Sequence, residues 1–158
     1  MDRPTTTTIN LHLFSYGINV GSYEKYPDDS IIYDIRKEHT EHVKIPEGKY
    51  QSGLDASFRK KLLKNENFAE LLEKIKTDIC NLQIDAEATQ RPINVVIMCH
   101  RGKHRSVSIV EELFNHFNNY NYCDDTKNMN IKYNISKVHL SMDWYNFIII
   151  SFQSIPYI

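Results

Sequence analysis

Apolar positions recur along the chain at two different spacings, and these spacings predict strands and helices in alternation. Residues 9–17 (INLHLFSYG) alternate apolar with other side chains and end in glycine, which is typical of a strand that runs into a turn. Residues 30–36 (SIIYDIR) form a short β-branched run, and residues 93–99 (INVVIMC) are continuously apolar, as in a buried parallel strand. Residues 131–140 (IKYNISKVHL) alternate again and predict a fourth strand.

Two other segments repeat apolar residues at the spacing of an α-helix. One lies before the third predicted strand and the other directly follows it. Residues 54–84 repeat apolar side chains three and four positions apart, with Asp55 suited to cap the start and a break expected at residues 65–67. Residues 104–117 (HRSVSIVEELFNHF) repeat the same spacing. Strands that alternate with helices predict an α/β fold, with a largely parallel sheet flanked by helices.

The remaining segments set the expected domain limits. Residues 1–8 are polar and threonine-rich, which predicts a flexible tail, and residues 9–158 are expected to form a single domain. Residues 37–53 and 118–130 lack periodicity and are predicted to be loops. The apolar and aromatic segment 141–158 fits a strand or a helix equally well.

Composition and charge narrow the class of protein. The chain has 158 residues with a formal net charge of -1, which suits one domain without a protein-wide basic field. Three irregularly spaced cysteines favour a reducing compartment. The first ten residues lack the apolar core of a signal peptide, and the longest apolar stretch (FIIISF) is too short to span a bilayer. We therefore expect a cytoplasmic protein, with a nuclear location also open, and no membrane partner.

The turn between the third strand and the following helix concentrates positive charge. Residues 99–106 (CHRGKHRS) place Gly102 where the backbone must turn tightly, and Arg105 and Ser106 at the start of the helix. Backbone N–H groups at a helix N-terminus bind anions, and Arg105 can hold a phosphate by two hydrogen bonds. Arg101 and Lys103 add charge, so the turn predicts a phosphate site rather than a solvated basic surface.

Other polar residues are expected beside this turn, because ligands of parallel sheets bind at the carboxyl ends of the strands. The predicted ligand-binding residues are Ser15, Tyr16, Gly17, Asp34, Arg36, Gly53, Asp55, Cys99, His100, Arg101, Gly102, Lys103, His104, Arg105, Ser106 and His139. A metal site is not expected, since His39 and His42 have no third partner in sequence and the charge around Cys99 and His104 opposes a cation. No cofactor is expected.

The spacing Cys99-x5-Arg105 is also that of the protein tyrosine phosphatases. In that chemistry a thiolate attacks phosphorus and the arginine holds the phosphoryl oxygens, and a helix N-terminus favours the thiolate. Cys99 and Arg105 are therefore candidate catalytic residues. Met98 stands where those enzymes usually have histidine, and Asp55, Asp34 and Asp143 are candidates for the general acid that no spacing singles out.

Four segments in the same order resemble the RapZ C-terminal domain family. They are LFSYGINVG (13–21), IIYDIR (31–36), SGLD (52–55) and VVIMCHRGKHRSVSIVEEL (95–113). The likeness extends from about Leu11 to Leu140. It implies an α/β domain that binds phosphate-bearing ligands, such as RNA or an amino-sugar phosphate, and that self-associates. Three segments depart from the family pattern. His100-Arg101 replaces threonine-glycine, residues 37–46 lack the family's asparagine-proline, and His139-Leu140 replaces histidine-arginine.

Three functions follow from these observations. The first is a binding module for RNA or a phosphorylated metabolite, such as a nucleotide or an amino-sugar phosphate. The second is a cysteine-dependent phosphatase or another phosphate-processing enzyme that uses Cys99 and Arg105. The third is a structural partner whose basic loop meets an acidic peptide. The binding module is favoured, because the sequence predicts a phosphate cradle without identifying an acid. The family's nucleotide-binding kinase-like domain and a Walker A motif are absent from these residues, so ATP hydrolysis is not implied.

Overall fold

The structure is a computed structural model that describes residues 5–22, 25–36, 52–119, 121–124 and 129–141. Its elements, in chain order, are β1 (Thr5–Gly17), β2 (Ile31–Asp34), α1 (Ala56–Leu62), α2 (Glu66–Asn81), α3 (Gln83–Thr89), β3 (Ile93–Cys99), α4 (Arg105–Asn118), β4 (Asn121–Asp124) and β5 (Met129–His139). Among the described helices, none combines the length and the apolar character needed to cross a membrane.

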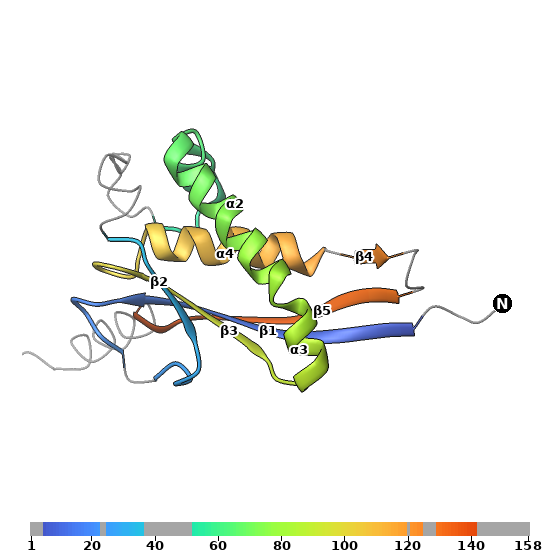
Figure 1. Cartoon of the computed structure of the whole chain (residues 1–158). Helices are drawn as coiled ribbons and strands as arrows, with labels where there is room; N and C mark the ends of the chain where they lie inside the picture. Colours follow the sequence, from blue (N-terminus) through green and yellow to red (C-terminus); the bar gives the residue numbers. More distant parts are fainter. Residues whose placement is uncertain (1–4, 23–24, 37–51, 120, 125–128, 142–158) are drawn as a thin grey trace, which may run out of the picture.

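The strands form one sheet in the order β2-β3-β1-β5-β4. The first four are parallel to one another, and β4 pairs antiparallel with β5 at the edge. Helices α2 and α4 lie over one face of the sheet (Figure 1). The predicted α/β fold with a largely parallel, helix-flanked sheet is therefore confirmed.

The register brings the carboxyl ends of the central strands together. Gly17 at the end of β1 lies beside Cys99 at the end of β3, and Ser15 lies beside His139 at the end of β5. On the outer side of β3, Asp34 at the end of β2 lies beside Met98. This edge, at the left of Figure 1, is also where α4 begins.

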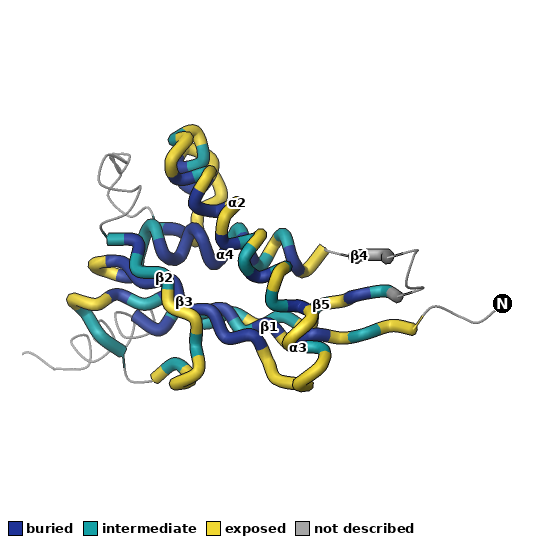
Figure 2. Tube along the Cα trace, in the orientation of Figure 1, coloured by how far each residue is buried: buried dark blue, intermediate teal, exposed yellow. Residues whose placement is uncertain are grey.

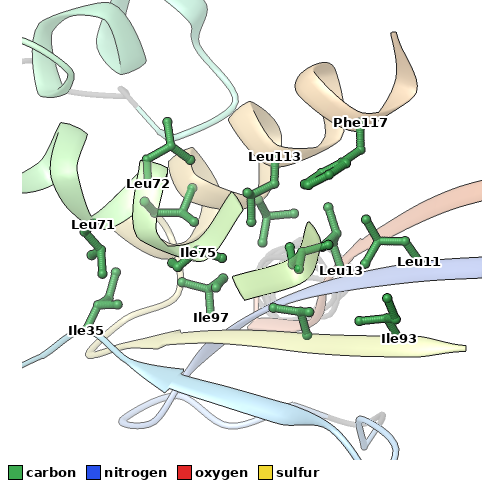
Figure 3. Packing of buried hydrophobic residues seen from close by; sticks show 14 of the residues in the cluster. Leu11, Leu13, Ile35, Leu71, Leu72, Ile75, Ile93, Ile97, Leu113 and Phe117 are labelled. Carbon is green, nitrogen blue, oxygen red and sulfur yellow. The ribbon is translucent and has the colours of Figure 1, made fainter. Parts of the chain in front are cut away.

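The core lies between the sheet and helices α2 and α4. Strand β3 is buried along its whole length (Figure 2), which explains why all its residues except Asn94 are apolar. Leu72 and Ile75 of α2 and Leu113 of α4 meet side chains of the central strands (Figure 3). This packing fixes the direction of α4 relative to the strand ends.

Three element boundaries differ from the sequence predictions. Strand β1 begins at Thr5, because the β-branched threonines 5–8 pair with residues 129–132 of β5, so strand pairing extends into the segment predicted as a flexible tail. The predicted helix 54–84 is three helices, with the expected break at Asn65, which caps α2, and a second break at Leu82. The short edge strand β4 lies within the predicted loop 118–130.

Candidate functional site

The chain curls over the sulfur of Cys99 directly after β3. The backbone N–H of Gly102 donates a hydrogen bond to Cys99 Sγ at 3.1 Å, and Ser106 Oγ lies 3.0 Å from the same sulfur. The cysteine itself is only 4% exposed. The thiol is therefore the floor of the turn, held between a backbone N–H and a hydroxyl at the start of α4.

Two glycines make this turn sterically feasible. Gly102 has a φ of 63°, in the left-handed region that favours glycine. A Cβ there would lie 2.6 Å from Gly17 N, and a Cβ on Gly17 would lie 2.3 Å from the carbonyl carbon of Arg101. The ends of β1 and of the basic turn thus touch backbone to backbone, so that any side chain at either position would collide with the other segment.

Hydrogen bonds fasten the segment after β1 to the same turn. Ile18 N donates to Cys99 O and Asn19 N donates to His100 O, both at 2.9 Å. Ser141 Oγ accepts from Gly17 N at 2.7 Å and donates to Gly21 O at 2.9 Å. The segment after β1 therefore holds the backbone of the turn, and Ser141, which follows β5, holds that segment in place.

A cavity of about 190 Å³ opens at this turn. Its lining is Cys99, His100, Arg101, His104 and Arg105, all of them predicted ligand-binding residues. Arg105 is the first residue of α4, and His104 is the N-cap residue, whose carbonyl accepts hydrogen bonds from the backbone N–H and the hydroxyl of Ser108. The cavity therefore lies at the positive end of a helix, beside two guanidinium groups and two imidazoles.

The segment 52–55 packs against the same helix start. Gly53 N donates to Lys103 O at 2.9 Å, and a Cβ on Gly53 would lie 2.4 Å from Ser108 N. Arg59, which is 7% exposed, donates from Nη1 to the carbonyls of Gly53 and Leu54 and from Nε to Glu112. Gly53 is thus a packing residue at the edge of the turn.

Asp55 has a structural role as the N-cap of α1. Its Oδ1 accepts from Ser57 N at 2.8 Å, Ser57 Oγ at 2.7 Å and Phe58 N at 3.3 Å. The hydrogen bond from the Ser57 hydroxyl, followed by those from the two backbone N–H groups, holds the pKa of Asp55 below its ordinary value. A carboxyl held ionised in this way is poorly suited to donate a proton as a general acid.

Asp34 and Arg36 form an ion pair with each other. The Arg36 guanidinium contacts the Asp34 carboxylate through Nε at 2.8 Å and Nη2 at 2.5 Å. In the register, Asp34 lies on the same face of the sheet as Met98 and Tyr16, opposite the face of Cys99. The two residues are at the predicted edge of the sheet but not among those that line the basic cavity.

His139 and Ser15 belong to a polar chain beneath α4. His139 Nδ1 lies 2.8 Å from Ser15 Oγ, and His139 Nε2 lies 2.8 Å from Glu111 Oε1. The second oxygen of Glu111 accepts from Lys137 Nζ at 2.8 Å. Burial acts to raise the pKa of Glu111, but the hydrogen bonds from Lys137 and His139 outweigh it and hold that pKa below its ordinary value. Ser15 is fully buried, so its role here is to anchor the histidine.

Three residues that hold the basic turn and its neighbours in place were not predicted from the sequence: Glu111, Ser141 and Arg59. Glu111 was detectable as an acidic position on the inward face of a helix. Ser141 has no sequence signal, because its partner Gly17 is 124 residues away. Arg59 has none either, because it stands beside two lysines on α1 and nothing local marks it as the buried one. The candidates His39, His42 and Asp143 lie outside the described residues. Within the described part of the chain, no three histidine, cysteine or acidic residues gather as potential metal ligands.

The amino-acid sequence of this chain is similar to that of a known protein family. The family model for the RapZ C-terminal domain matches residues 9–132. A protein of Clostridium botulinum (strain Eklund 17B / Type B), named as a nucleotide-binding protein, is 32% identical over 122 residues, which cover 77% of this chain and 39% of that protein. A Geobacter sulfurreducens protein of the same description is 32% identical over 111 residues, covering 68% of this chain and 37% of that protein.

The match includes the strand end, the basic turn and most of the residues described above. The chain spans about two fifths of the length of the curated relatives it matches. The family model covers the chain from the first strand into the last. On that evidence, the chain belongs to the RapZ C-terminal domain family.

Proposed function

We propose that this protein is a binding module for a phosphate-bearing ligand, and that the phosphate occupies the turn of residues 99–106. The observation that supports this most is the cavity of about 190 Å³, lined by Arg101, Arg105 and two histidines at the N-terminus of α4. Guanidinium groups and helix N-termini both favour phosphate, by charge and by hydrogen bonding. The relatives' names support a nucleotide as the ligand class.

The rigidity of the turn also favours a binding site. The close contact of Gly17 with Gly102 and the hydrogen bonds from Ile18 and Asn19 hold the backbone before any ligand arrives. A preformed cradle loses little conformational entropy on binding. The side chains of His100 and Arg101 are exposed, so they are available to a ligand that approaches from solvent.

The proposal is tested by titration calorimetry with inorganic phosphate and with ribose 5-phosphate. Arg105→Ala should weaken binding by about 1.5–3 kcal/mol, the contribution of a hydrogen bond to a charged group. Arg91→Ala is the matched control, because Arg91 is an exposed arginine before the amino end of β3, at the opposite edge of the sheet. Equal affinity in the Arg105→Ala and Arg91→Ala proteins would contradict the assignment.

A phosphatase is the second candidate, and the position of Cys99 favours it. The sulfur lies at the floor of the basic cavity and accepts a hydrogen bond from Gly102 N, as a nucleophilic thiolate requires. Among the described residues, however, no carboxylate lines the cavity, and Asp55 is engaged as a helix cap. We therefore expect background phosphate release from an aryl phosphate. Phosphate release well above background that is abolished by Cys99→Ser would favour the phosphatase over the binding module.

A further inference from the structure

A second cavity, lined by residues of β1 and of the segment before β2, is larger than the first. It has a volume of about 290 Å³ and is lined by Tyr16, Ser22, Lys25, Tyr26 and Asp28. Tyr16 alternates with Ser15 and Gly17 along β1, so its side chain lies on the face of the sheet opposite Cys99. The proposed phosphate site leaves this cavity unexplained.

The two tyrosines form an aromatic corner. Their ring centroids are 5.7 Å apart and the ring planes meet at 80°. Both residues are half-buried, so each ring is held in place while part of its surface faces the cavity. Two nearly perpendicular rings offer a planar ligand one face to stack on and one edge to abut, and stacking of bases on tyrosine is a common mode of nucleotide recognition.

The polar groups of the cavity suit a neutral base better than a second phosphate. Lys25 offers donors and the Asp28 carboxylate offers acceptors, which together match the mixed donors and acceptors on the edge of a nucleobase. The negative charge of Asp28 disfavours an anion in the same space. A sugar phosphate without a base would have no group that uses the aromatic corner.

One short strip of backbone connects the lining of the second cavity to the basic turn. Tyr16 directly precedes Gly17, which contacts the backbone of Arg101 and Gly102, and the next residue, Ile18, donates its N–H to Cys99 O. Tyr16, which lines the second cavity, is therefore one residue away from a backbone contact with Arg101, which lines the first. We propose that the cavity of Tyr16 and Tyr26 binds a nucleobase carried by the phosphate-bearing ligand. This inference rests on the proposed function, because the phosphate at residues 99–106 supplies the other half of the site.

The test compares ligands that differ only in the base. Titration calorimetry measures ribose 5-phosphate, adenosine and uridine 5′-monophosphate, and the corresponding 5′-phosphorylated dinucleotides. At least one nucleotide should bind about five- to hundred-fold more tightly than ribose 5-phosphate, the range expected for one stacked base. A benefit in the dinucleotides alone assigns the cavity to the base of the neighbouring nucleotide and supports the proposal equally.

The variants separate the two halves of the site. Tyr16→Ala and Tyr26→Ala should each remove most of the benefit of the base and leave ribose 5-phosphate affinity unchanged, whereas Tyr16→Phe and Tyr26→Phe should retain it. Tyr26 lies outside the sheet, so Tyr26→Ala provides the test even if Tyr16→Ala does not fold. Equal affinity for ribose 5-phosphate and for every nucleotide, or a benefit that survives both alanine variants, would overturn the inference. Loss of ribose 5-phosphate binding only in Arg105→Ala would still support the phosphate site.

Discussion

His139 on β5 and Glu111 on α4 are joined by a 2.8 Å contact between Nε2 and Oε1, which ties the sheet to the helix that begins at the basic turn. Ser15 holds the other ring nitrogen from β1, and Lys137 holds the other carboxylate oxygen from β5. Two strands and one helix thus share a single buried acidic residue. Its hydrogen bonds fix the rotation of α4, and therefore the direction in which the first turn of α4 faces.

Glu111→Gln should destabilise the protein by about 1–3 kcal/mol near neutral pH, because hydrogen bonds from charged donors lose their ionised acceptor. The pKa of Glu111 is held below its ordinary value of 4.5 in the folded state. The stability from its ionised form is therefore fully present above pH 4.5 and is lost as the pH falls through the lower, folded-state pKa. Urea unfolding from pH 6 to pH 3 should show the difference between the two proteins shrinking with falling pH.

Glu73→Gln is a control for that experiment. Glu73 is an exposed residue of α2 that pairs with the partly buried Lys76, and a pair whose carboxylate is open to solvent contributes at most about 1 kcal/mol. A Glu111→Gln penalty that stays constant down to pH 3, or that equals the Glu73→Gln penalty, would show that the carboxylate has no special role.

Three glycine-to-alanine substitutions separate backbone strain from collision. Gly21 has a positive φ, but the nearest atom to its added Cβ is 3.9 Å away, so Gly21→Ala should cost about 1–2 kcal/mol from strain alone. Gly17→Ala adds a collision at 2.3 Å without a positive φ, and Gly102→Ala combines both effects. Thermal unfolding should rank Gly102→Ala below Gly21→Ala in stability, and the reverse order would argue against the close contact of the two segments.

Asp55→Ala should cost about 1 kcal/mol of stability, because α1 loses its N-cap, and Asp55→Ser should restore most of it. Neither change should alter phosphate affinity, since the carboxylate is committed to Ser57 and Phe58. Denaturant unfolding and calorimetry on the same preparations measure both effects. A large loss of phosphate affinity in Asp55→Ser would indicate that Asp55 contacts the ligand.

Arg59→Lys should destabilise the protein by about 1.5–3 kcal/mol, although it keeps the charge. The guanidinium donates through Nη1 to two carbonyls and through Nε to Glu112, and an ammonium group cannot reproduce that planar geometry. Lys61→Arg, at an exposed position on the same helix, is the control and should change stability little. Hydrogen exchange at Gly53 N, which donates to Lys103 O, should accelerate in Arg59→Lys if the arginine holds this segment.

The sequence pattern predicted the parts of the fold that depend on burial. The mostly apolar run of residues 93–99 matches β3, and the basic turn follows it directly because a strand end and a helix start are adjacent in the chain. Strand β4 was not predicted, because the sequence NYCD shows no apolar alternation and an edge strand needs none. The break at Leu82 was also missed, since that residue keeps right-handed helical angles and no proline or glycine marks it.

The candidate site likewise contains residues that the sequence predicts and residues whose contacts depend on the tertiary fold. Residues 99–106 were predicted as one unit because their geometry follows from local sequence. The chain of Ser15, His139 and Glu111 depends on the register of β5 against β1 and on the rotation of α4, which involve separations of 28 and 124 residues. Asp55 was predicted both as a helix cap and as a ligand residue, and its hydrogen bonds show the cap.

The contact between Gly17 and Gly102 also bears on which positions of the turn can be substituted. The shape of the turn depends on two residues without side chains and on backbone hydrogen bonds, not on the identity of the exposed residues between them. Positions 100 and 101 are therefore free to change without altering the path of the backbone. Single substitutions at these two positions can thus change the outward-facing chemistry of the turn, which makes them the natural positions at which to alter the selectivity of the proposed phosphate site.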